Sequence, residues 1–365
     1  MIRIKNITDY LESIAPLSYQ ESYDNSGLIT GNPDTEVKGV LICLDSTEAV
    51  IREAIQTGCN MVIAHHPIIF SGLKKITGKN YVERTILLAI KNDIAIYAIH
   101  TNLDNVSAGV NKMIGEKLGL INLRILAPKS SLLRKLVTFC PLEDAPKVRD
   151  ALFLAGAGSI GNYDECSFNV QGQGTFRGNE ASNPQKGKKG ERHMENEIRI
   201  ETIFENHNQN RIIQALLKNH PYEEVAYDIY TLANNFREIG SGMIGELSEN
   251  QTEMAFLKHV KETMKAGIIR HTSLIGQPIS KVAICGGSGS FLLNEAISSG
   301  AQVFITADYK YHQFFDSEEK IVIADIGHYE SEQFTKDLIK TLILEKFSTF
   351  AVRLTEVNTN PVHYM

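Results

Sequence analysis

The segment MVIAHHPIIF, residues Met61–Phe70, ends an apolar run with two histidines and a proline. The apolar residues are typical of a buried strand in a parallel sheet, and the carboxyl ends of such strands line the ligand-binding edge. Adjacent residues on an extended chain point to opposite sides. His65 and His66 could therefore face two metal ions, or one could bind a metal while the other packs. Pro67 favours extended backbone at His66, which would hold either arrangement.

The surrounding segments alternate between strand-like and helix-like patterns. Apolar runs bounded by turn residues predict strands, and apolar residues at helical spacing predict helices. The alternation predicts an α/β fold with a mainly parallel sheet. The predicted elements are a strand over 37–45, a helix over 46–58, a strand over 60–66, a helix over 81–93 and a strand over 94–104 that runs into a loop.

The same pattern returns late in the chain. Residues 281–308 align with residues 39–66 at a constant offset of 242 and without a gap. The identities predict two related βαβ halves, with convergence of two ordinary βαβ units as the alternative. Under the alignment His66 corresponds to Asp308. The identical pairs are Val40/Val282, Ile42/Ile284, Cys43/Cys285, Ser46/Ser288, Glu53/Glu295, Ala54/Ala296, Ile55/Ile297, Gly58/Gly300 and Ile63/Ile305.

Between the two halves the order of predicted elements changes. Residues 135–156 predict a strand and a helix, 165–177 a strand, and 196–232 a strand, a helix and a strand. This βαβ-βαβ order predicts an inserted ferredoxin-like α+β domain. The polar segment 178–196, rich in Gly and Lys, predicts a mobile hairpin tip, with an anion-binding loop as the alternative. The predicted division is a first half over 1–127, an inserted domain over 128–236 and a second half over 237–365.

Composition limits the classes of function. The net charge is −6 with no long basic run, which argues against bulk electrostatic binding to nucleic acid and leaves only a local patch open. No apolar run is long enough to span a membrane, and the first residues lack the apolar core of a signal peptide. Five scattered cysteines fit a reducing compartment. We therefore expect a cytoplasmic protein that does not engage a membrane.

Two further predicted strands also end in metal-binding residue types. HTNLD, residues 100–104, follows one strand, and HYESE, residues 328–332, follows the predicted strand 320–327. In a helix that begins at His328, Glu332 lies on the same face at i+4. Imidazole and carboxylate groups suit divalent first-row metals, and a carboxylate can bridge two ions roughly 3.5–4 Å apart. The predicted ligands of two ions are His65, His66, Asp104, His328 and Glu332.

Two other features near these strand ends leave alternatives open. Asp308 and His312 would share a face if they lay on a helix, as a second shell or a substrate contact. The alternative is that Asp308 caps the helix and His312 is an ordinary surface residue. CGGSGS, residues 285–290, could cradle an anion with its backbone N–H groups, or form a tight turn that needs glycine.

The motifs together resemble the GTP cyclohydrolase I type 2 homolog family, the Nif-three-like proteins with a dinuclear metal centre. The resemblance covers essentially the whole chain, although Tyr23 stands where the family usually has tryptophan. It implies that the five predicted ligands bind two divalent cations in a homohexamer, a trimer of dimers. It also implies that the middle segment is similar to PII and CutA proteins, through NYDECSF, GTF and HPYEEVAYD. The motifs are SYDNSGL at 22–28, HHP at 65–67, HTNLD at 100–104, the strand and GGSG loop at 281–289, TADYKYH at 306–312 and GHYESE at 327–332.

These observations favour a metal-dependent hydrolase that acts on a nucleotide, a cyclic amide or a phosphoester. Asp308 or His312 would move a proton in that reaction. The alternative is a metal-binding, regulatory or metal-carrier protein that acts through protein partners, with an unidentified small-molecule ligand on the inserted domain. A nucleic-acid binder is a third hypothesis, against which the acidic balance weighs. The ligand set leaves zinc, iron, manganese and nickel open.

Overall fold

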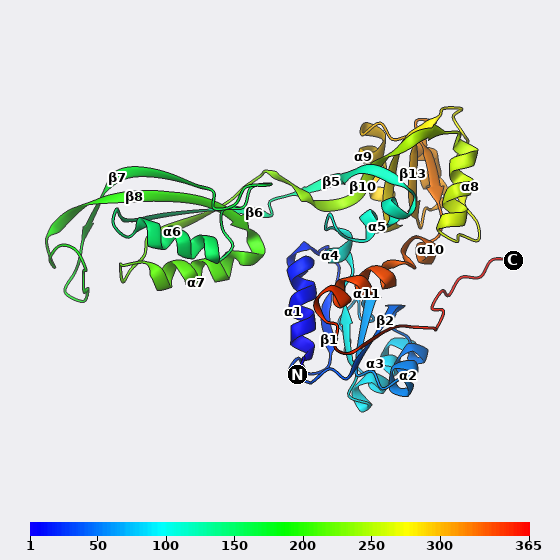
Figure 1. Cartoon of the computed structure of the whole chain (residues 1–365), viewed down its shortest axis with the longest axis horizontal. Helices are drawn as coiled ribbons and strands as arrows, with labels where there is room; N and C mark the ends of the chain where they lie inside the picture. The colour runs from blue at the N-terminus through cyan, green and yellow to red at the C-terminus, as the bar shows by residue number, and fades with distance from the viewer. The chain divides into compact units, whose positions relative to one another are not determined.

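The structure is a computed structural model that describes residues 1–365. The chain forms two compact units. Unit 1 comprises Met1–Pro128 and Arg237–Met365, and unit 2 comprises Lys129–Phe236. Unit 2 is therefore one continuous segment that interrupts unit 1 in the sequence (Figure 1). No helix is both long and apolar enough to cross a membrane.

Unit 1 contains a five-stranded sheet that is built mainly from the first half of the chain and is completed by a strand near the C-terminus. In spatial order its strands are β1 (Gly27–Thr30), β4 (Ala95–Ala98), β3 (Met61–His66), β2 (Gly39–Asp45) and β15 (Ala351–Leu354). All neighbours pair in parallel except β1, which is antiparallel to β4. The helices of this half are α1 (Ile4–Ile14), η1 (Leu17–Tyr19), α2 (Glu48–Gln56), α3 (Tyr81–Lys91), α4 (Thr101–Asp104) and α5 (Val110–Lys117). The predicted mainly parallel sheet is confirmed.

Side-chain caps fix the starts of two of these helices. The Thr47 side chain accepts a hydrogen bond from Val50 N, and the Asn80 side chain accepts one from Glu83 N. Such caps typically contribute about 1 kcal/mol each to helix stability. Apolar side chains of α2 and α3 pack in one core cluster with β2, β3 and β4. The end of β3, where the two histidines lie, is thus held by a packed sheet with capped helices.

Unit 1 also contains a six-stranded sheet that is built mainly from the second half of the chain and is completed by a strand from the end of the first half. In spatial order its strands are β11 (Arg270–His271), β14 (Val322–Asp325), β13 (Val303–Ala307), β12 (Ile279–Ser288), β10 (Asn235–Gln251) and β5 (Leu120–Ser130). The helical elements of this part of the chain are α8 (Glu253–Thr263), η3 (Ser290–Leu292), α9 (Leu293–Ser298), η4 (Tyr311–Ser317), α10 (His328–Glu332) and α11 (Thr335–Lys346). Of these, α11 packs against β2 and β15 of the five-stranded sheet. The strands β12, β13 and β14 pair in parallel, as β2, β3 and β4 do.

The two parallel ladders also have the same register. Val40 pairs with Met61 in the first half, and Val282 pairs with Val303 in the second. Both residues of the second pair lie 242 positions after their counterparts. The third strands follow the same scheme, because Met61 pairs with Ala95 and Val303 with Val322. The third strands, β4 and β14, therefore end at equivalent positions. The helix α4 follows β4, and α10 follows β14.

Unit 2 is one antiparallel sheet with helices packed against it. Its elements are β6 (Leu133–Pro141), α6 (Ala145–Leu154), β7 (Ser167–Arg177), β8 (Arg192–Glu205), η2 (Asn206–Asn208), α7 (Gln209–Asn219) and β9 (Tyr227–Thr231). The strand order is β7-β8-β6-β9, and every neighbouring pair is antiparallel. Buried side chains of α6 and α7, such as Leu152 and Leu216, form one core with Leu136 of β6 and Ile200 of β8.

Two predicted boundaries were wrong. The loop predicted over 178–196 is shorter, because β8 begins at Arg192 and residues 192–196 pair with 173–177 of β7. Polar side chains on both strands concealed this pairing in the sequence. The segment 94–104, predicted as a strand that runs into a loop, forms a strand only to Ala98, and the helix α4 takes the place of the loop from Thr101. Asp104 therefore lies at the end of a helical turn.

Candidate metal centre

His65 lies near the C-terminal end of β3 with a fully buried side chain. Its Nδ1 lies 2.8 Å from the carbonyl oxygen of Ile99. A carbonyl oxygen can only accept, so Nδ1 carries the proton and Nε2 presents a lone pair. This Nε2 is buried and has no hydrogen-bond partner. An imidazole anchored in this way is oriented to bind a metal ion through Nε2.

His66 is anchored by a carboxylate on the neighbouring strand. The register of the sheet places Asp45 of β2 opposite His66 of β3. Asp45 Oδ1 lies 2.8 Å from His66 Nδ1, and the Thr359 hydroxyl donates to Asp45 Oδ2 at 2.7 Å. On its other side His66 Nε2 lies 2.9 Å from Oε2 of Glu332. Residues 266 positions apart in the chain are thus in contact.

The second half contributes His328 and Glu332 from α10. The helix begins at His328, as predicted, and His328 Nε2 lies 3.1 Å from Glu332 Oε2. His328 Nδ1 lies 2.7 Å from Oδ2 of Asp308, which follows β13. Asp308 has a φ of 58°, a left-handed conformation that aspartate adopts more readily than most residues. Asp308 therefore anchors His328 as Asp45 anchors His66.

Asp104 completes the cluster from α4. Its Oδ1 lies 3.6 Å from His65 Nε2, and the same nitrogen lies 3.8 Å from Oε1 of Glu332. Neither distance is a hydrogen bond, and Asp104 Oδ1 and His65 Nε2 are both buried without a partner. Leaving such groups unsatisfied costs roughly 1–3 kcal/mol each. A divalent cation between them would satisfy both, since such ions lie about 2.0–2.2 Å from imidazole nitrogen and carboxylate oxygen.

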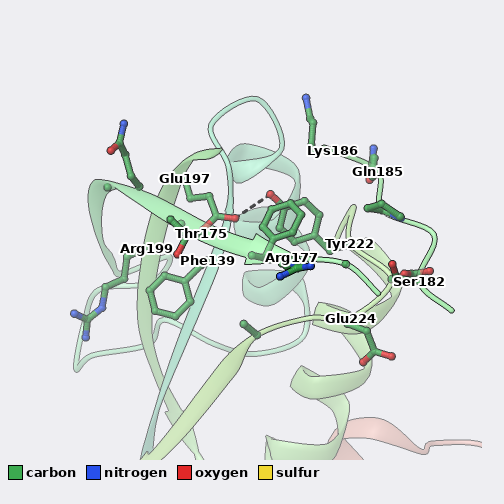
Figure 2. A pocket seen from close by; sticks show the side chains of 18 of the residues that line it. Phe139, Thr175, Arg177, Ser182, Gln185, Lys186, Glu197, Arg199, Tyr222 and Glu224 are labelled. Atoms are coloured by element: carbon green, nitrogen blue, oxygen red, sulfur yellow. Dashed lines mark hydrogen bonds between the residues drawn. The ribbon is translucent and has the colours of Figure 1, made fainter. Parts of the chain in front are cut away.

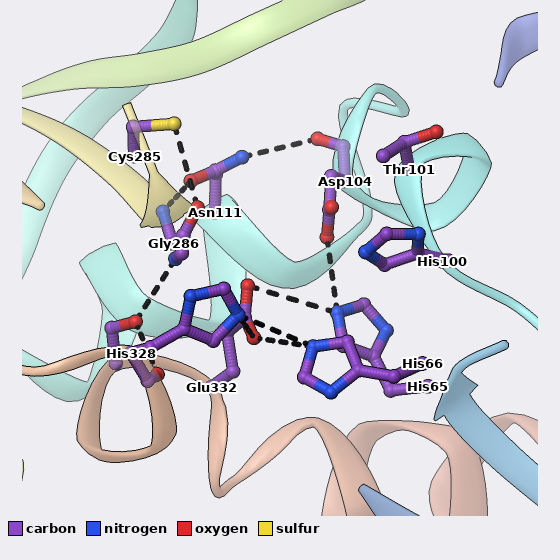
Figure 3. A network of polar contacts seen from close by, with 12 residues as sticks. His65, His66, His100, Thr101, Asp104, Asn111, Cys285, Gly286, His328 and Glu332 are labelled. Atoms are coloured by element: carbon purple, nitrogen blue, oxygen red, sulfur yellow. Dashed lines mark hydrogen bonds and ion pairs between the residues drawn. The ribbon is translucent and has the colours of Figure 1, made fainter. Parts of the chain in front are cut away.

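A second gap lies between the imidazoles of His66 and His328. Their Nε2 atoms are 3.4 Å apart, while both Nδ1 atoms already donate to carboxylates. Two neutral rings would therefore point lone pairs at each other, so a proton or a cation is needed between them. Figure 3 shows these rings and His65 around Glu332, whose Oε2 faces one gap and whose Oε1 faces the other.

The ionisation of the cluster reflects its packed charges. Burial opposes protonation of His66 and His328, but their carboxylate partners outweigh it and raise the pKa values to about 9 and about 11. Burial, and then the charge of Glu332, raise the pKa of Asp104 to about 8. Burial would raise the pKa of Glu332 as well, but His328 and the other imidazoles hold it well below its ordinary value. The cluster thus retains protons that a bound cation would displace.

His100 is a fourth imidazole at this edge, and the sequence prediction did not include it among the ligands. Its Nδ1 lies 2.8 Å from Oδ1 of Asp24, and its ring lies 5.3 Å from the rings of His65 and His66. These three histidines have nitrogen atoms within 4.8 Å of one another. Both His100 and Asp24 lie in motifs that the sequence highlighted, but nothing in the sequence joins SYDNSGL to HTNLD. The contact depends on how the chain packs.

The cluster opens on a cavity of about 300 Å³ in unit 1. His66, His100 and Glu332 are among its lining residues. Three exposed aromatic residues also line it, and they are Tyr23, Phe70 and Phe291. The groups that could hold a metal ion are therefore accessible to a small molecule whose planar or apolar part meets these rings.

Asp308 and His312 do not share a helix face. Asp308 precedes the 3₁₀ helix η4 and caps no helix, so the helix-cap interpretation was wrong, whereas its contact with His328 agrees with a position in the second shell. His312 is exposed on η4, where its ring contacts Tyr311 and Phe315. It is not among the residues that line the cavity beside the cluster.

The glycine-rich segment uses its backbone for packing. Gly286 N donates to Asn111 Oδ1, and Gly287 N donates to Ser331 Oγ, both at 2.9 Å. Gly287 has a φ of 64°, and a Cβ added there would lie 2.5 Å from Oε1 of Glu332. Because side chains already occupy these two N–H groups, the anion cradle considered from the sequence is not formed by them. The tight turn that needs glycine agrees with the structure.

The chain as a whole is similar to known proteins. A model of the Duf34/NIF3 (NGG1p interacting factor 3) family matches residues 2–361 of this chain. The chain belongs to the Duf34/NIF3 family. The resemblance found from the sequence motifs is thereby confirmed.

Full-length Duf34/NIF3 relatives are similar to this chain. A protein of Halalkalibacterium halodurans named GTP cyclohydrolase 1 type 2 homolog is 38% identical over 99% of this chain and 98% of its own length. A Bacillus subtilis protein of the same name is 36% identical over the same shares. The crystal structure of a Bacillus cereus protein related to NIF3 has a TM-score of 0.84 at 38% identity, covering 100% of this chain and 99% of that one.

Proposed function

We propose that unit 1 binds two divalent cations and is a metal-dependent hydrolase. The first ion would be held by His65, Asp104 and Oε1 of Glu332. The second would be held by His66, His328 and Oε2 of Glu332, so that Glu332 would contribute one oxygen to each ion. The donor set suits zinc, iron, manganese or nickel, and three protein ligands per ion would be typical of a catalytic site.

The observation that carries this proposal is the pair of gaps around Glu332. One gap is bordered by His65 Nε2 and Asp104 Oδ1, both buried and without partners. The other lies between the Nε2 atoms of His66 and His328, 3.4 Å apart. The unsatisfied buried atoms of the first gap destabilise the fold unless a bound group meets them, and the two imidazoles of the second gap already face the shared Oε2 of Glu332.

The protein's own residues would prepare the site for hydrolysis. Bound ions would supply Lewis acidity, which makes a water molecule a better nucleophile toward a phosphoryl, carbonyl or ring carbon. Asp45 and Asp308 hold the second ion's imidazoles in one tautomer. His100, fixed by Asp24, borders the open side of the cluster and would contact the substrate there. The cavity size and its aromatic lining favour a nucleotide, a cyclic amide or a phosphoester as the substrate class.

We also infer the roles of the other parts of the chain. The element order and the β7-β8-β6-β9 strand order of unit 2 support a ferredoxin-like, PII/CutA-like module inserted between residues 127 and 237. The two halves of unit 1, 1–127 and 237–365, would then form a single metal-binding domain. The family resemblance supports a homohexamer built as a trimer of dimers.

A metal-binding protein that acts through protein partners is the second candidate. The family description, NGG1p interacting factor 3, names a protein interaction and supports this alternative. In that case the ions would be structural or cargo, and no substrate would be turned over. Transfer of the ions to an acceptor protein would distinguish it from the hydrolase.

The metal content of purified protein tests the proposal. Elemental analysis of wild type should give two divalent ions per chain. His65→Ala should retain one, and Glu332→Gln should retain fewer than one. His271→Ala, which removes an exposed imidazole on β11, is the matched control and should retain two. A His65→Ala protein with full metal content would overturn the two-ion assignment.

Turnover tests the hydrolase separately. Wild type loaded with manganese or zinc should hydrolyse at least one member of a panel of nucleotides, cyclic amides and phosphoesters. His65→Ala should lose that activity, and His271→Ala should keep it. Two bound ions without turnover of any panel member would favour the metal-carrier alternative.

A further inference from the structure

Unit 2 contains a cavity of its own, far larger than the one beside the metal cluster. Its volume is about 680 Å³, within the range of roughly 300–1,000 Å³ that is usual for small-molecule sites. It is lined by β7, by the hairpin tip that follows β7, by β8 and by the segment before β9 (Figure 2). All of its lining residues lie between 139 and 226, within unit 2.

A buried carboxylate lies at one side of this cavity. Glu197 of β8 is only 9% exposed, and Tyr222 donates a hydrogen bond of 2.9 Å to its Oε1. Burial and the neighbouring Glu197 raise the pKa of Tyr222, so its hydroxyl stays a neutral donor. No side chain donates to Oε2, and Gly174 lets that oxygen lie close against β7, because a Cβ at residue 174 would be only 2.1 Å from it. An acceptor in this position suits a ligand that offers N–H groups.

An unpaired guanidinium borders the same cavity. Arg199 is paired with Glu201, and Lys186 with Glu143, both at 2.9 Å. Arg177 lines the cavity as an exposed residue, and its guanidinium has no acidic partner or hydrogen bond in the structure (Figure 2). A free guanidinium presents a planar fork of donors that matches a phosphate or carboxylate. The cavity therefore combines an acceptor for N–H groups with a donor set for an anion.

Aromatic and amide side chains line the cavity in addition to Glu197 and Arg177. Phe139, Phe176 and Tyr222 line the cavity, and the rings of Phe176 and Tyr222 lie 6.0 Å apart. The side chains of Gln171 and Gln173 add hydrogen-bonding groups. Aromatic faces with a few polar groups are the usual surroundings of a planar heterocycle.

We propose that this cavity binds a mononucleotide. The base lies against the aromatic walls with its N–H groups directed at Glu197, and the phosphate meets Arg177. A carboxylate accepts two adjacent N–H groups of guanine, whereas adenine presents a ring acceptor at the equivalent position. Glu197 therefore selects guanine over adenine. This site is separate from the metal cluster and needs no ion.

The hairpin tip, residues 178–191, closes over one side of the cavity. It is attached to the rest of unit 2 by Asn183 N, which donates to Glu223 Oε1 at 2.7 Å, and by the Lys186–Glu143 pair. Surface pairs such as Lys186–Glu143 contribute little to stability. The tip can therefore part from the cavity to admit a ligand and close again, without unfolding the core of unit 2.

Calorimetric titration of the full-length chain tests the site. GMP, AMP and inorganic phosphate are each titrated into protein freed of metal by a chelator. GMP should bind, AMP at least about tenfold more weakly, and phosphate more weakly still. Arg177→Met should weaken GMP binding roughly tenfold or more, because a charge-assisted contact is lost. Glu197→Gln should weaken GMP binding and bring the GMP and AMP affinities together.

Matched variants separate this site from general charge effects and from the metal cluster. Arg192→Met removes a guanidinium from the residue paired with Arg177 on β8, outside the cavity, and should leave GMP affinity unchanged. His65→Ala should also leave it unchanged. The proposal is overturned if GMP fails to bind metal-free protein, if Arg177→Met and Arg192→Met behave alike, or if His65→Ala abolishes binding. Circular dichroism of each variant verifies the fold, and Glu197→Gln offers a second test if Arg177→Met unfolds.

Discussion

Thr359 lies 314 positions after Asp45 in the chain, yet its hydroxyl donates a hydrogen bond of 2.7 Å to Oδ2 of that carboxylate. Asp45 in turn fixes His66 through Oδ1. The C-terminal segment therefore reaches the candidate metal centre through one intermediate residue. Contacts of this kind hold a metal-binding imidazole in one tautomer and one orientation.

Replacing Thr359 with valine should lower the affinity for the second ion without abolishing its binding. Thr359→Val keeps the shape of the side chain and deletes the hydroxyl, so Asp45 gains freedom and His66 loses orientation. Loss of such outer contacts typically lowers metal affinity about 10–100-fold. Competition with a chromophoric chelator measures that affinity. Thr341→Val removes a hydroxyl that bonds a helix carbonyl on α11 and is the control. Equal affinities for both variants would show that Thr359 has no such role.

Substitutions of Asp308 should lower the affinity for the second ion more than that for the first, because Asp308 anchors only His328, a ligand of the second ion. Asp308→Asn retains an acceptor oxygen and tolerates the φ of 58°, so it should lose less than tenfold in affinity. Asp308→Ala removes the acceptor and adds roughly 1–2 kcal/mol of left-handed backbone strain, so it should lose both affinity and thermal stability. Stepwise metal titration distinguishes the two ions.

His312→Ala provides the control for Asp308. His312 was predicted from the sequence beside Asp308, but it is exposed and packs only against its neighbours on η4. We expect this variant to match wild type in metal affinity and in any turnover. A large loss of turnover with unchanged metal affinity would instead assign His312 a role in the reaction.

The sequence predicted the candidate centre well where chemistry and local geometry coincide. The i, i+4 spacing of His328 and Glu332 and the strand-end position of His65 and His66 follow from short-range rules, and the structure brings all four together with Asp104. The internal repeat agrees with this arrangement. The parallel strands of both halves pair in the same register, so the segments that follow their carboxyl ends occupy equivalent positions.

What the sequence could not give depends on packing between distant segments. Asp24 contacts His100 across 76 positions, and Thr359 contacts Asp45 across 314. No periodicity encodes such pairs. Likewise Glu197 in unit 2 is an ordinary strand residue in the sequence, and only the fold shows that it is buried beside a cavity.

The metal-free protein should lose stability as the pH rises. The pKa values of His66 and His328 are raised to about 9 and about 11, so the stability they contribute is fully present below about pH 6.5 and is lost as the pH rises through those values. Asp104 acts in the same direction, since its raised pKa of about 8 favours the protonated form in the folded state. The melting temperature in chelator should therefore fall between pH 6.5 and pH 9.

Stabilisation by metal should increase with pH, opposite to the stability of the metal-free protein, because the ions must displace the same protons. The rise in melting temperature on adding manganese should be larger at pH 8.5 than at pH 6.5. Differential scanning fluorimetry with and without the ion measures both trends in one series. A metal-free melting temperature that climbs over this interval would contradict the proton-filled cluster. His66→Gln should flatten the dependence, because it removes one of the titrating groups.

Gly287 should be essential to the geometry of Glu332. A Cβ at this position would lie 2.5 Å from Oε1 of Glu332, and the φ of 64° already disfavours any side chain. Gly287→Ala should therefore both destabilise the fold and displace the carboxylate that faces both gaps. We expect a drop in melting temperature and loss of at least one ion per chain, measured by elemental analysis.

Gly300→Ala separates backbone strain from the contact with Glu332. Gly300 has a comparable φ of 77°, and nothing lies within 4 Å of the Cβ that would be added. The strain, roughly 1–2 kcal/mol, should lower the melting temperature of both variants by a similar amount. Only Gly287→Ala should lose metal, because only there does the methyl group push against Oε1. If Gly300→Ala lost metal equally, the effect would come from general destabilisation, and the steric argument for Gly287 would fail.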